Sequence, residues 1–204
     1  AWAGADFVVG REARSAYDEP HAPEKADHCT MGNSLMFKAR DAGHPVPFIK
    51  PDWANTYTEH DLRRRIHEDV TSGYWWIELG GGRYNTIADA EILRDELLKA
   101  VYGVWDHIKN GGEHGAQNME LEWVGMLPGK RESRRLLGDY VLNEADCAGG
   151  RRFADAVAYG GWPMDVHTVE GFLNDSDDPT VWLRLEDVYT IPYRCYYSRN
   201  IPNL

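Results

Sequence analysis

The chain has 204 residues, with 33 acidic against 22 basic side chains and a formal net charge of −11 at pH 7. An acidic surface disfavours nucleic acid and anionic membranes as partners, because both carry negative charge. Hydrophobic residues make up 43% of the chain, including 8 Trp, which is ample for a folded core. No stretch approaches the roughly 18 uninterrupted apolar residues that a membrane-spanning helix needs.

The three cysteines, Cys29, Cys147 and Cys195, are odd in number and widely separated. No C-x-x-C pair occurs, so neither a zinc ribbon nor an iron–sulfur cluster is indicated. Free thiols are therefore expected, which slightly favours a reducing compartment such as the cytoplasm.

The first half of the chain alternates short β-rich runs with loops that contain Pro and Gly. Strands are expected at 7–9, 29–39 and 74–79, with irregular segments at 17–27 and 41–51. Thr58 is predicted to be the N-cap of a helix that continues to about Asp69. Residues 63–65 are three adjacent arginines on that helix and cannot share one face, so they are interpreted as a solvated surface.

The strongest local pattern predicts a helix from Ile87 to about Lys109. Thr86 with Asp89 three residues later fits a capping box. Apolar residues recur at steps of three and four and form one stripe: Ala90, Leu93, Leu97, Val101, Val104 and Ile108. Gly103 interrupts the pattern at a cost of about 1 kcal/mol relative to Ala.

The second half of the chain predicts further strands. Residues 119–123 alternate apolar and acidic side chains, and Pro128-Gly129 is expected to turn this strand back into a second one. One helical turn at 143–150 precedes a strand at 156–167, which Gly160-Gly161 interrupts. Closing strands are expected at 181–185 and 188–191. Together the patterns predict one α+β domain: a mostly antiparallel sheet with one long helix packed across a face.

Several stretches resemble the FAD-dependent oxidoreductase family, among the glutathione-reductase-like flavoproteins. The similarity is clearest in Pro-Gly-Lys-Arg-Glu-Ser-Arg-Arg (128–135), Gly-Asp-Tyr (138–140) and Tyr-Gly-Gly-Trp-Pro-Met-Asp-Val-His (159–167). It extends to Cys-Thr-Met-Gly (29–32), Trp-Trp-Ile-Glu-Leu-Gly-Gly (75–81) and Ile-Pro-Tyr-Arg-Cys-Tyr-Tyr-Ser-Arg-Asn (191–200). The resemblance implies an FAD cofactor and hydride transfer from an organic substrate to the flavin.

The chain lacks the G-x-G-x-x-G turn that holds a dinucleotide pyrophosphate at a helix N-terminus. The nearest stretch, 80–85, departs from that pattern at its last position. Residues 1–204 are therefore interpreted as the substrate-side domain of such an enzyme, without the flanking FAD-binding segments. We expect the domain alone to be inactive, to hold no FAD by itself, and to self-associate through the apolar face that would meet those segments.

Three residues are candidates for the proton that leaves the substrate. His167 is the first, because an unperturbed imidazole titrates near neutral pH. Asp165 lies two positions earlier, so the two side chains would share one face of a strand and form an oriented pair. Tyr193 is the third candidate. The alternative for His167 is a purely structural role at a strand end.

A second set of residues is expected to contact the substrate or the flavin. Arginines suit a carboxylate or phosphate because they bind it with two parallel hydrogen bonds. If 131–135 were a strand, Arg131, Ser133 and Arg135 would share one face, while Glu132 could pair with Arg134 on the other. The full set is Arg131, Glu132, Ser133, Arg134, Arg135, Gly161, Trp162 and Arg194.

Two other functions remain open from the sequence. A non-catalytic carbohydrate- or ligand-binding module would use the aromatic residues as a stacking platform for a sugar ring, namely Trp75, Trp76, Tyr159, Trp162, Tyr193, Tyr196 and Tyr197. A metal-dependent hydrolase would use Asp165 and His167. No i, i+4 His pair is present, so the sequence predicts no metal site; one would arise only by tertiary packing of His21, His28, His60 or His67.

Overall fold

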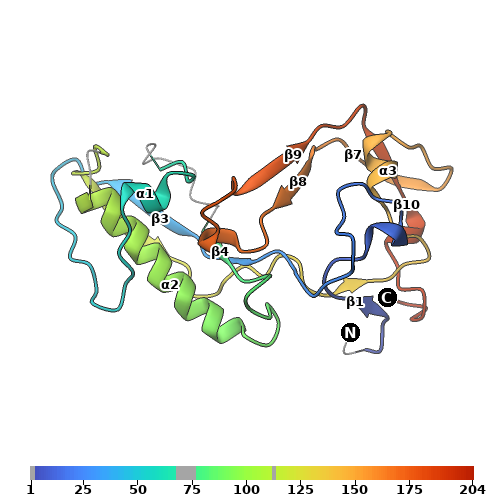
Figure 1. The fold of residues 1–204 in the computed structure, drawn as a ribbon, viewed down its shortest axis with the longest axis horizontal. Helices are drawn as coiled ribbons and strands as arrows, with labels where there is room; N and C mark the ends of the chain where they lie inside the picture. The colour runs from blue at the N-terminus through green and yellow to red at the C-terminus, as the bar shows by residue number, and fades with distance from the viewer. Residues whose placement is uncertain (1–2, 68–76, 112–113) are drawn as a thin grey trace. The chain divides into compact units, whose positions relative to one another are not determined.

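The computed structural model describes residues 3–67, 77–111 and 114–204 (Figure 1). The chain divides into two compact units, each built from segments that are distant in sequence. The first unit comprises Ala1–Thr30, Glu132–Val166 and Thr180–Leu204, and the second comprises Met31–Arg131 and His167–Pro179. Each unit is described by itself.

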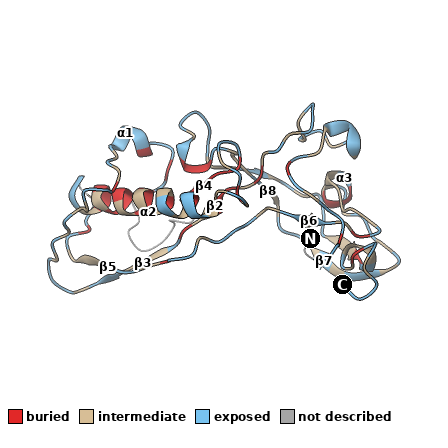
Figure 2. Cartoon of the chain, turned by 90° about the horizontal axis from the view of Figure 1, so that it is seen from below, coloured by how far each residue is buried: buried red, intermediate tan, exposed pale blue. Residues whose placement is uncertain are grey.

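The second unit is organised around the long helix α2 (Ala90–Asp106), which continues as a π-helical turn, η3 (His107–Gly111). The predicted apolar stripe is confirmed, since its members from Leu93 to Ile108 are at most 1% exposed. Figure 2 shows buried residues along this helix. Two strand pairs belong to the same unit: β2 (Asn33–Ser34) with β4 (Glu78–Leu79), and β3 (Phe37–Asp41) with β5 (Met119–Val124).

The N-terminus of α2 differs from the predicted capping box. The N-cap is Asp89, and its side chain accepts a hydrogen bond from the Asn85 backbone N–H at 2.9 Å. Asn85 in turn accepts from the N–H groups of Ile87 and Ala88. The start of the helix is thus fixed by an exchange of bonds between Asn85 and Asp89, and Thr86 is not the cap.

Gly103 has a packing reason to lie inside the helix. A Cβ at this position would lie 2.5 Å from the carbonyl oxygen of Asn55. The Asn55 N–H donates to the Lys99 carbonyl at 3.1 Å, so the segment before α1 lies directly against the helix. The glycine allows this close approach, which no sequence pattern predicts.

The helix predicted after Thr58 is only partly confirmed. Thr58 and Asp61 form a capping box, but the helix α1 ends at Leu62 (Glu59–Leu62) rather than near Asp69. Residues 68–69 lie outside the described part of the chain. The helix ends early because Arg65 turns inward: it is 4% exposed, and its Nη2 donates to the carbonyls of Gly171 and Asn174. The interpretation of Arg65 as a solvated side chain is therefore wrong.

The predicted hairpin at Pro128-Gly129 is also wrong. The β5 strand pairs with β3, and Gly129 instead exchanges two backbone hydrogen bonds with Ser34. A bulge places Trp123 opposite Lys38 and Leu121 opposite Ala39, so Glu122 has no partner residue in the ladder. Because a bulge changes which face the following side chains occupy, Trp123 is 51% exposed, while Val124 packs against the core.

The first unit contains short strands and one short helix. The β1 strand (Phe7–Val8) pairs with β6 (Arg135–Leu136), and β7 (Ala156–Gly160) pairs with β10 (Tyr189–Pro192). The helical turn expected at 143–150 is confirmed as α3 (Glu144–Ala148), which starts at a capping box of Asn143 and Asp146. The interruption at Gly161 is confirmed too, because β8 (Met164–His167) is a separate strand that pairs with β9 (Thr180–Leu183). Among the described residues, the 3-10 turns η1 (Arg14–Ala16) and η5 (Tyr193–Cys195) belong to this unit, whereas η4 (Gly171–Leu173) belongs to the second.

The α+β class is confirmed, with one long helix and antiparallel pairing in every ladder between named strands of the described residues. The strands form separate two-stranded sheets rather than one broad sheet. The three cysteines are free thiols. Burial raises the pKa of the Cys29 thiol, which disfavours the reactive thiolate. Within the described residues, no helix combines the length and the apolar character needed to cross a membrane.

Candidate functional site

A buried carboxylate, Glu78, lies at the centre of a polar group in the second unit. Glu78 is the first residue of β4 and directly follows Ile77, and both residues are at most 2% exposed. Its Oε1 lies 2.9 Å from His167 Nδ1, and its Oε2 accepts from Arg131 Nη1 at 3.2 Å. A buried charge is tolerated when it is paired and hydrogen-bonded, and these two contacts meet that requirement.

The contact with Glu78 sets the orientation of the His167 ring. Where the carboxylate is ionised it can only accept a hydrogen bond, so Nδ1 is then the donor, and in a neutral ring Nε2 is the nitrogen that carries no hydrogen. A carboxylate behind an imidazole holds its tautomer and stabilises the imidazolium that forms when the ring takes a proton. The side chains of Glu78 and His167 are each 3% exposed, so water screens this pair poorly.

The sequence predicted His167 but paired it with Asp165. In the structure, the Asp165 carboxylate accepts a hydrogen bond from the Thr180 hydroxyl, and the carboxylate at His167 is Glu78. The sequence did contain one indication of a role for Glu78. It is a single acidic residue inside the apolar run 75–79, and if that run is buried, its charge needs a partner. Tyr193 is 58% exposed, with its ring 5.3 Å from that of Tyr197.

The arginines that were predicted to contact the substrate or the flavin do not all belong to one unit. Arg131 belongs to the second unit, where it binds Glu78, whereas Arg134 and Arg135 belong to the first. Arg135 forms ion pairs with Glu12 and Glu132, and Arg134 lies over the Phe7 ring at 5.7 Å. The strand assumed over 131–135 is wrong as well, because β6 covers only Arg135–Leu136. Ser133, half-buried, lies in the irregular segment before it.

A pocket of about 400 Å³ in the first unit includes Arg135 among its lining residues. Most of its charged lining is acidic, with Glu12, Glu19, Glu132 and Glu144 around it. Since like charges repel, this lining disfavours the substrate carboxylate that the arginines suggested.

One aromatic candidate of the first unit, Trp162, lies beside a second exposed tryptophan, Trp182, which the sequence analysis did not single out. Trp162 is 70% exposed and Trp182 is 49% exposed, with ring centroids 5.5 Å apart. A Cβ at Gly161, the residue before Trp162, would lie 2.8 Å from Val188 Cγ1, so the Val188 side chain would have to shift. Arg194 is committed to a two-contact ion pair with Asp155. Trp75 and Trp76 lie outside the described residues.

The Gly-rich turn after β4 does not fit the pyrophosphate of FAD. Helix α2 begins at Ala90, so it does not start within this turn as the helix after a dinucleotide-binding turn does. A Cβ at Gly82 would lie 2.3 Å from Glu170 Oε1, so a carboxylate already occupies the place where a phosphate would approach. Negative charge there repels a phosphate. In the described parts of the chain, these glycines therefore do not form a dinucleotide site.

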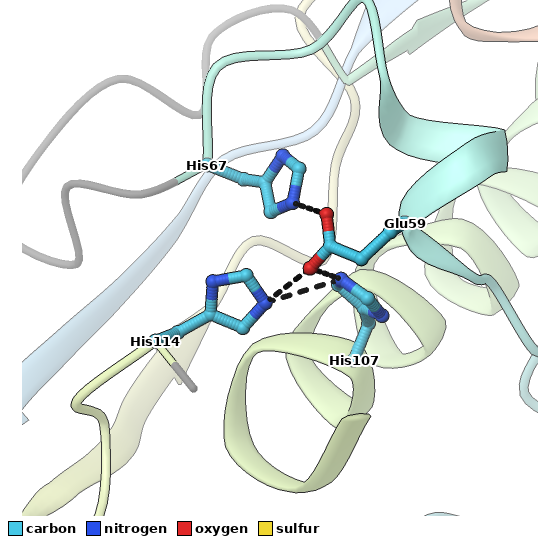
Figure 3. Close-up of side chains that lie close together, drawn as sticks. All are labelled: Glu59, His67, His107 and His114. Carbon is cyan, nitrogen blue, oxygen red and sulfur yellow. Dashed lines mark hydrogen bonds and ion pairs between the residues drawn. The ribbon is translucent and has the colours of Figure 1, made fainter. Parts of the chain in front are cut away.

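Three histidines and one glutamate converge elsewhere in the second unit (Figure 3). Glu59 comes from the first turn of α1, His67 from the segment after α1, His107 from the end of α2, and His114 from the loop before β5. One ligand atom of each lies within 4.8 Å of those of the others. The sequence predicted no metal site, because these four residues have no recognisable spacing and meet only through tertiary packing.

Comparison with known proteins gives one match. The family model described as FAD dependent oxidoreductase matches residues 1–204. Searches of curated proteins and of solved structures found no match.

Proposed function

Since this chain belongs to the FAD-dependent oxidoreductase family, we propose that it forms the part of such an enzyme that holds an organic substrate and takes up its proton. In this family the flavin accepts the electrons, so the surrounding protein has to bind, orient and deprotonate the substrate. The family match over the whole of residues 1–204 is the observation that carries the oxidoreductase role.

We propose His167 as the group that accepts the proton. Its geometry supports this role because Glu78 lies 2.9 Å from Nδ1, and a hydrogen on Nδ1 makes Nε2 the basic nitrogen of the neutral ring. Arg131 bonds to the other oxygen of Glu78 and holds the carboxylate in place. Glu78 and Arg131 are thus positioning residues, which act through the imidazole.

The test is His167→Ala in the flavin-loaded oxidoreductase. Turnover should fall by about 100-fold or more, the usual contribution of a positioned general base, while flavin content and KM stay close to wild type. Added imidazole should restore part of the lost turnover, because a small base can enter the space left by the ring. A merely structural histidine would not respond to imidazole.

His44→Ala is the matched control, because His44 is an exposed histidine of the same unit whose Nδ1 contacts the carbonyl oxygen of its neighbour Pro45. The control should retain wild-type turnover. Full activity of the His167→Ala variant with intact flavin would remove His167 from the mechanism.

The exposed tryptophans of the first unit favour a second candidate function, sugar binding. Exposed indole rings offer the apolar surface on which a pyranose ring stacks, and Trp162 and Trp182 are 70% and 49% exposed. We therefore propose carbohydrate as the ligand class of this surface. It is compatible with a sugar- or polyol-oxidising enzyme and also with a non-catalytic module.

Trp162→Ala should weaken binding of a soluble oligosaccharide by about tenfold, because a stacked aromatic ring contributes on the order of 1 kcal/mol beyond its buried area. Isothermal titration against a panel of neutral and acidic oligosaccharides measures this change. Trp53→Ala is the control: Trp53 is also about half exposed, at 52%, and contacts a ring, Tyr102, in the other unit. Equal affinity of wild type and the Trp162→Ala variant across the panel would exclude this surface.

A further inference from the structure

The outer nitrogens of two rings in the cluster of Glu59, His67, His107 and His114 bond to backbone carbonyls. His67 Nδ1 contacts the Arg65 carbonyl oxygen, and His107 Nδ1 lies 3.2 Å from the Tyr57 carbonyl oxygen. A carbonyl oxygen only accepts hydrogen bonds, so both Nδ1 atoms must carry hydrogen. In the neutral rings, each Nε2 then directs a lone pair toward the centre of the cluster.

His67 Nε2 and His107 Nε2 therefore face the Glu59 carboxylate as acceptors facing another acceptor. His67 Nε2 lies 3.1 Å from Glu59 Oε2, and His107 Nε2 lies 3.1 Å from Oε1. His114 Nε2 lies 2.9 Å from the same Oε1 and 3.2 Å from His107 Nε2.

Lone pairs that face one another at these distances need positive charge between them. Protons on the rings are one source, and a metal cation is the other. Imidazole nitrogen and carboxylate oxygen are the ligands that zinc and similar divalent ions take in proteins. With metal–nitrogen bonds of about 2.0–2.1 Å, ligands at the corners of a tetrahedron are about 3.3 Å apart. The contact of 3.2 Å between His107 and His114 is close to that spacing.

We propose that Glu59, His67, His107 and His114 form a four-ligand site for a divalent transition-metal ion of the zinc type. Three imidazoles supply Nε2, and Glu59 supplies one carboxylate oxygen (Figure 3). The ion accepts a lone pair from each of the four ligand atoms, so these atoms bond to the ion instead of repelling one another. Neither the family assignment nor the role proposed for His167 requires this site.

The surroundings of the rings fit metal ligation. Metal-bound histidines usually donate their other N–H to a carbonyl or a carboxylate, which fixes the ring, and His67 and His107 both do so. A Cβ at Gly111 would lie 2.8 Å from His107 Nδ1, so the glycine leaves room for this ring. The π-helical turn His107–Gly111 begins at the same residue, and such turns are frequent at functional sites.

Burial points to a structural role for the ion. The three imidazoles are 2–7% exposed, whereas Glu59 is 62% exposed and closes the solvent side. Four protein ligands leave no open position in a tetrahedral site. The ion joins α1, the end of α2 and the loop before β5, and so fixes segments of the second unit that are up to 55 residues apart in sequence, from Glu59 to His114 (114 − 59).

The probe is Zn²⁺ added to protein that has been stripped with a chelator, with binding followed by titration calorimetry and by metal analysis. Wild type should bind one equivalent. Glu59→Gln and His114→Gln should each weaken zinc binding by about 100-fold or more, because even outer-shell changes cost 10–100-fold. Co²⁺ bound in place of zinc should give the intense visible absorption of a tetrahedral site, and Zn²⁺ should displace it.

His60→Gln is the matched control, since this histidine adjoins Glu59 on α1 but is exposed and contacts Arg63 outside the cluster. It should bind zinc like wild type. Glu59→Gln keeps the shape of an exposed side chain, so the far-UV circular dichroism of this variant should match wild type. Weaker zinc binding by this variant would then reflect the lost ligand and not a change in folding.

Stripped wild-type protein that takes up no zinc and gives no cobalt absorption would overturn the proposal and leave protonated rings as the charge at the centre. The same conclusion follows if folded Glu59→Gln and His114→Gln variants both bind zinc as tightly as wild type. These results are independent of turnover, so they do not depend on the role of His167.

Discussion

Replacing Trp105 with alanine is expected to lower the free energy of unfolding of the second unit by about 3–5 kcal/mol, the usual cost of removing a large aromatic from a core. Trp105 is 0% exposed, and its ring meets Phe37 edge-on at 6.0 Å and Phe48 at 6.5 Å. The indole N–H has no acceptor among the described residues. The cost therefore comes from lost packing and from the cavity, with no hydrogen bond to replace.

Urea unfolding followed by far-UV circular dichroism measures this change, because α2 lies in the affected unit. Trp123→Ala is the matched control, since Trp123 belongs to the same unit and is 51% exposed. Its midpoint should move much less. Similar losses for the two variants would contradict the placement of Trp105 at the centre of the core.

The second large effect is expected in the first unit, where Asp146→Ala should cost about 3 kcal/mol, near the lower end for removing one member of a buried ion pair. Asp146 is 2% exposed and accepts hydrogen bonds from the Tyr140 hydroxyl and from Arg151 Nη1, each at 2.7 Å. It also closes the capping box with Asn143. The lower end applies because Arg151 is 54% exposed and can turn to water when its partner is lost.

The other capping box in the chain provides the control. Asp61 occupies the same position after Thr58, but its side chain is exposed, so water can replace the bonds lost in an Asp61→Ala variant. Thermal unfolding should show a clearly larger shift for Asp146→Ala than for Asp61→Ala. Equal shifts would mean that only the capping bonds matter and that the buried contacts of Asp146 contribute little.

The sequence was most informative where a local pattern was strong. The stripe from Leu93 to Ile108 predicted α2, and the structure buries those side chains to within 1%. Thr58 was predicted as an N-cap, and the structure confirms it and adds Asp61 as its capping-box partner. The short helical turn predicted at 143–150 is also confirmed, and it starts at a capping box of Asn143 and Asp146. The family resemblance, carried by stretches such as 128–135 and 159–167, is confirmed by the match over residues 1–204.

Local sequence patterns did not predict which strands pair with one another. Pro128-Gly129 has the composition of a hairpin turn, yet β5 pairs with β3 and β6 pairs with β1. The residues of a turn predict that the chain bends there. They do not predict which strand pairs with which, because pairing depends on the apolar faces that the rest of the fold offers. For the same reason, the bulge opposite Lys38 and Ala39 reversed the expected burial of Trp123.

The sequence by itself determined the family, the α+β class, the long helix and the candidate His167. Tertiary structure decided which carboxylate meets that histidine: Glu78, 89 residues away, rather than Asp165. It also brought Glu59 to His67, His107 and His114, which share no periodicity. Periodicity and capping depend on interactions between residues a few positions apart, so they can be recognised in the sequence. A buried polar cluster depends on contacts between distant segments, because a buried charge is stable only when it is paired.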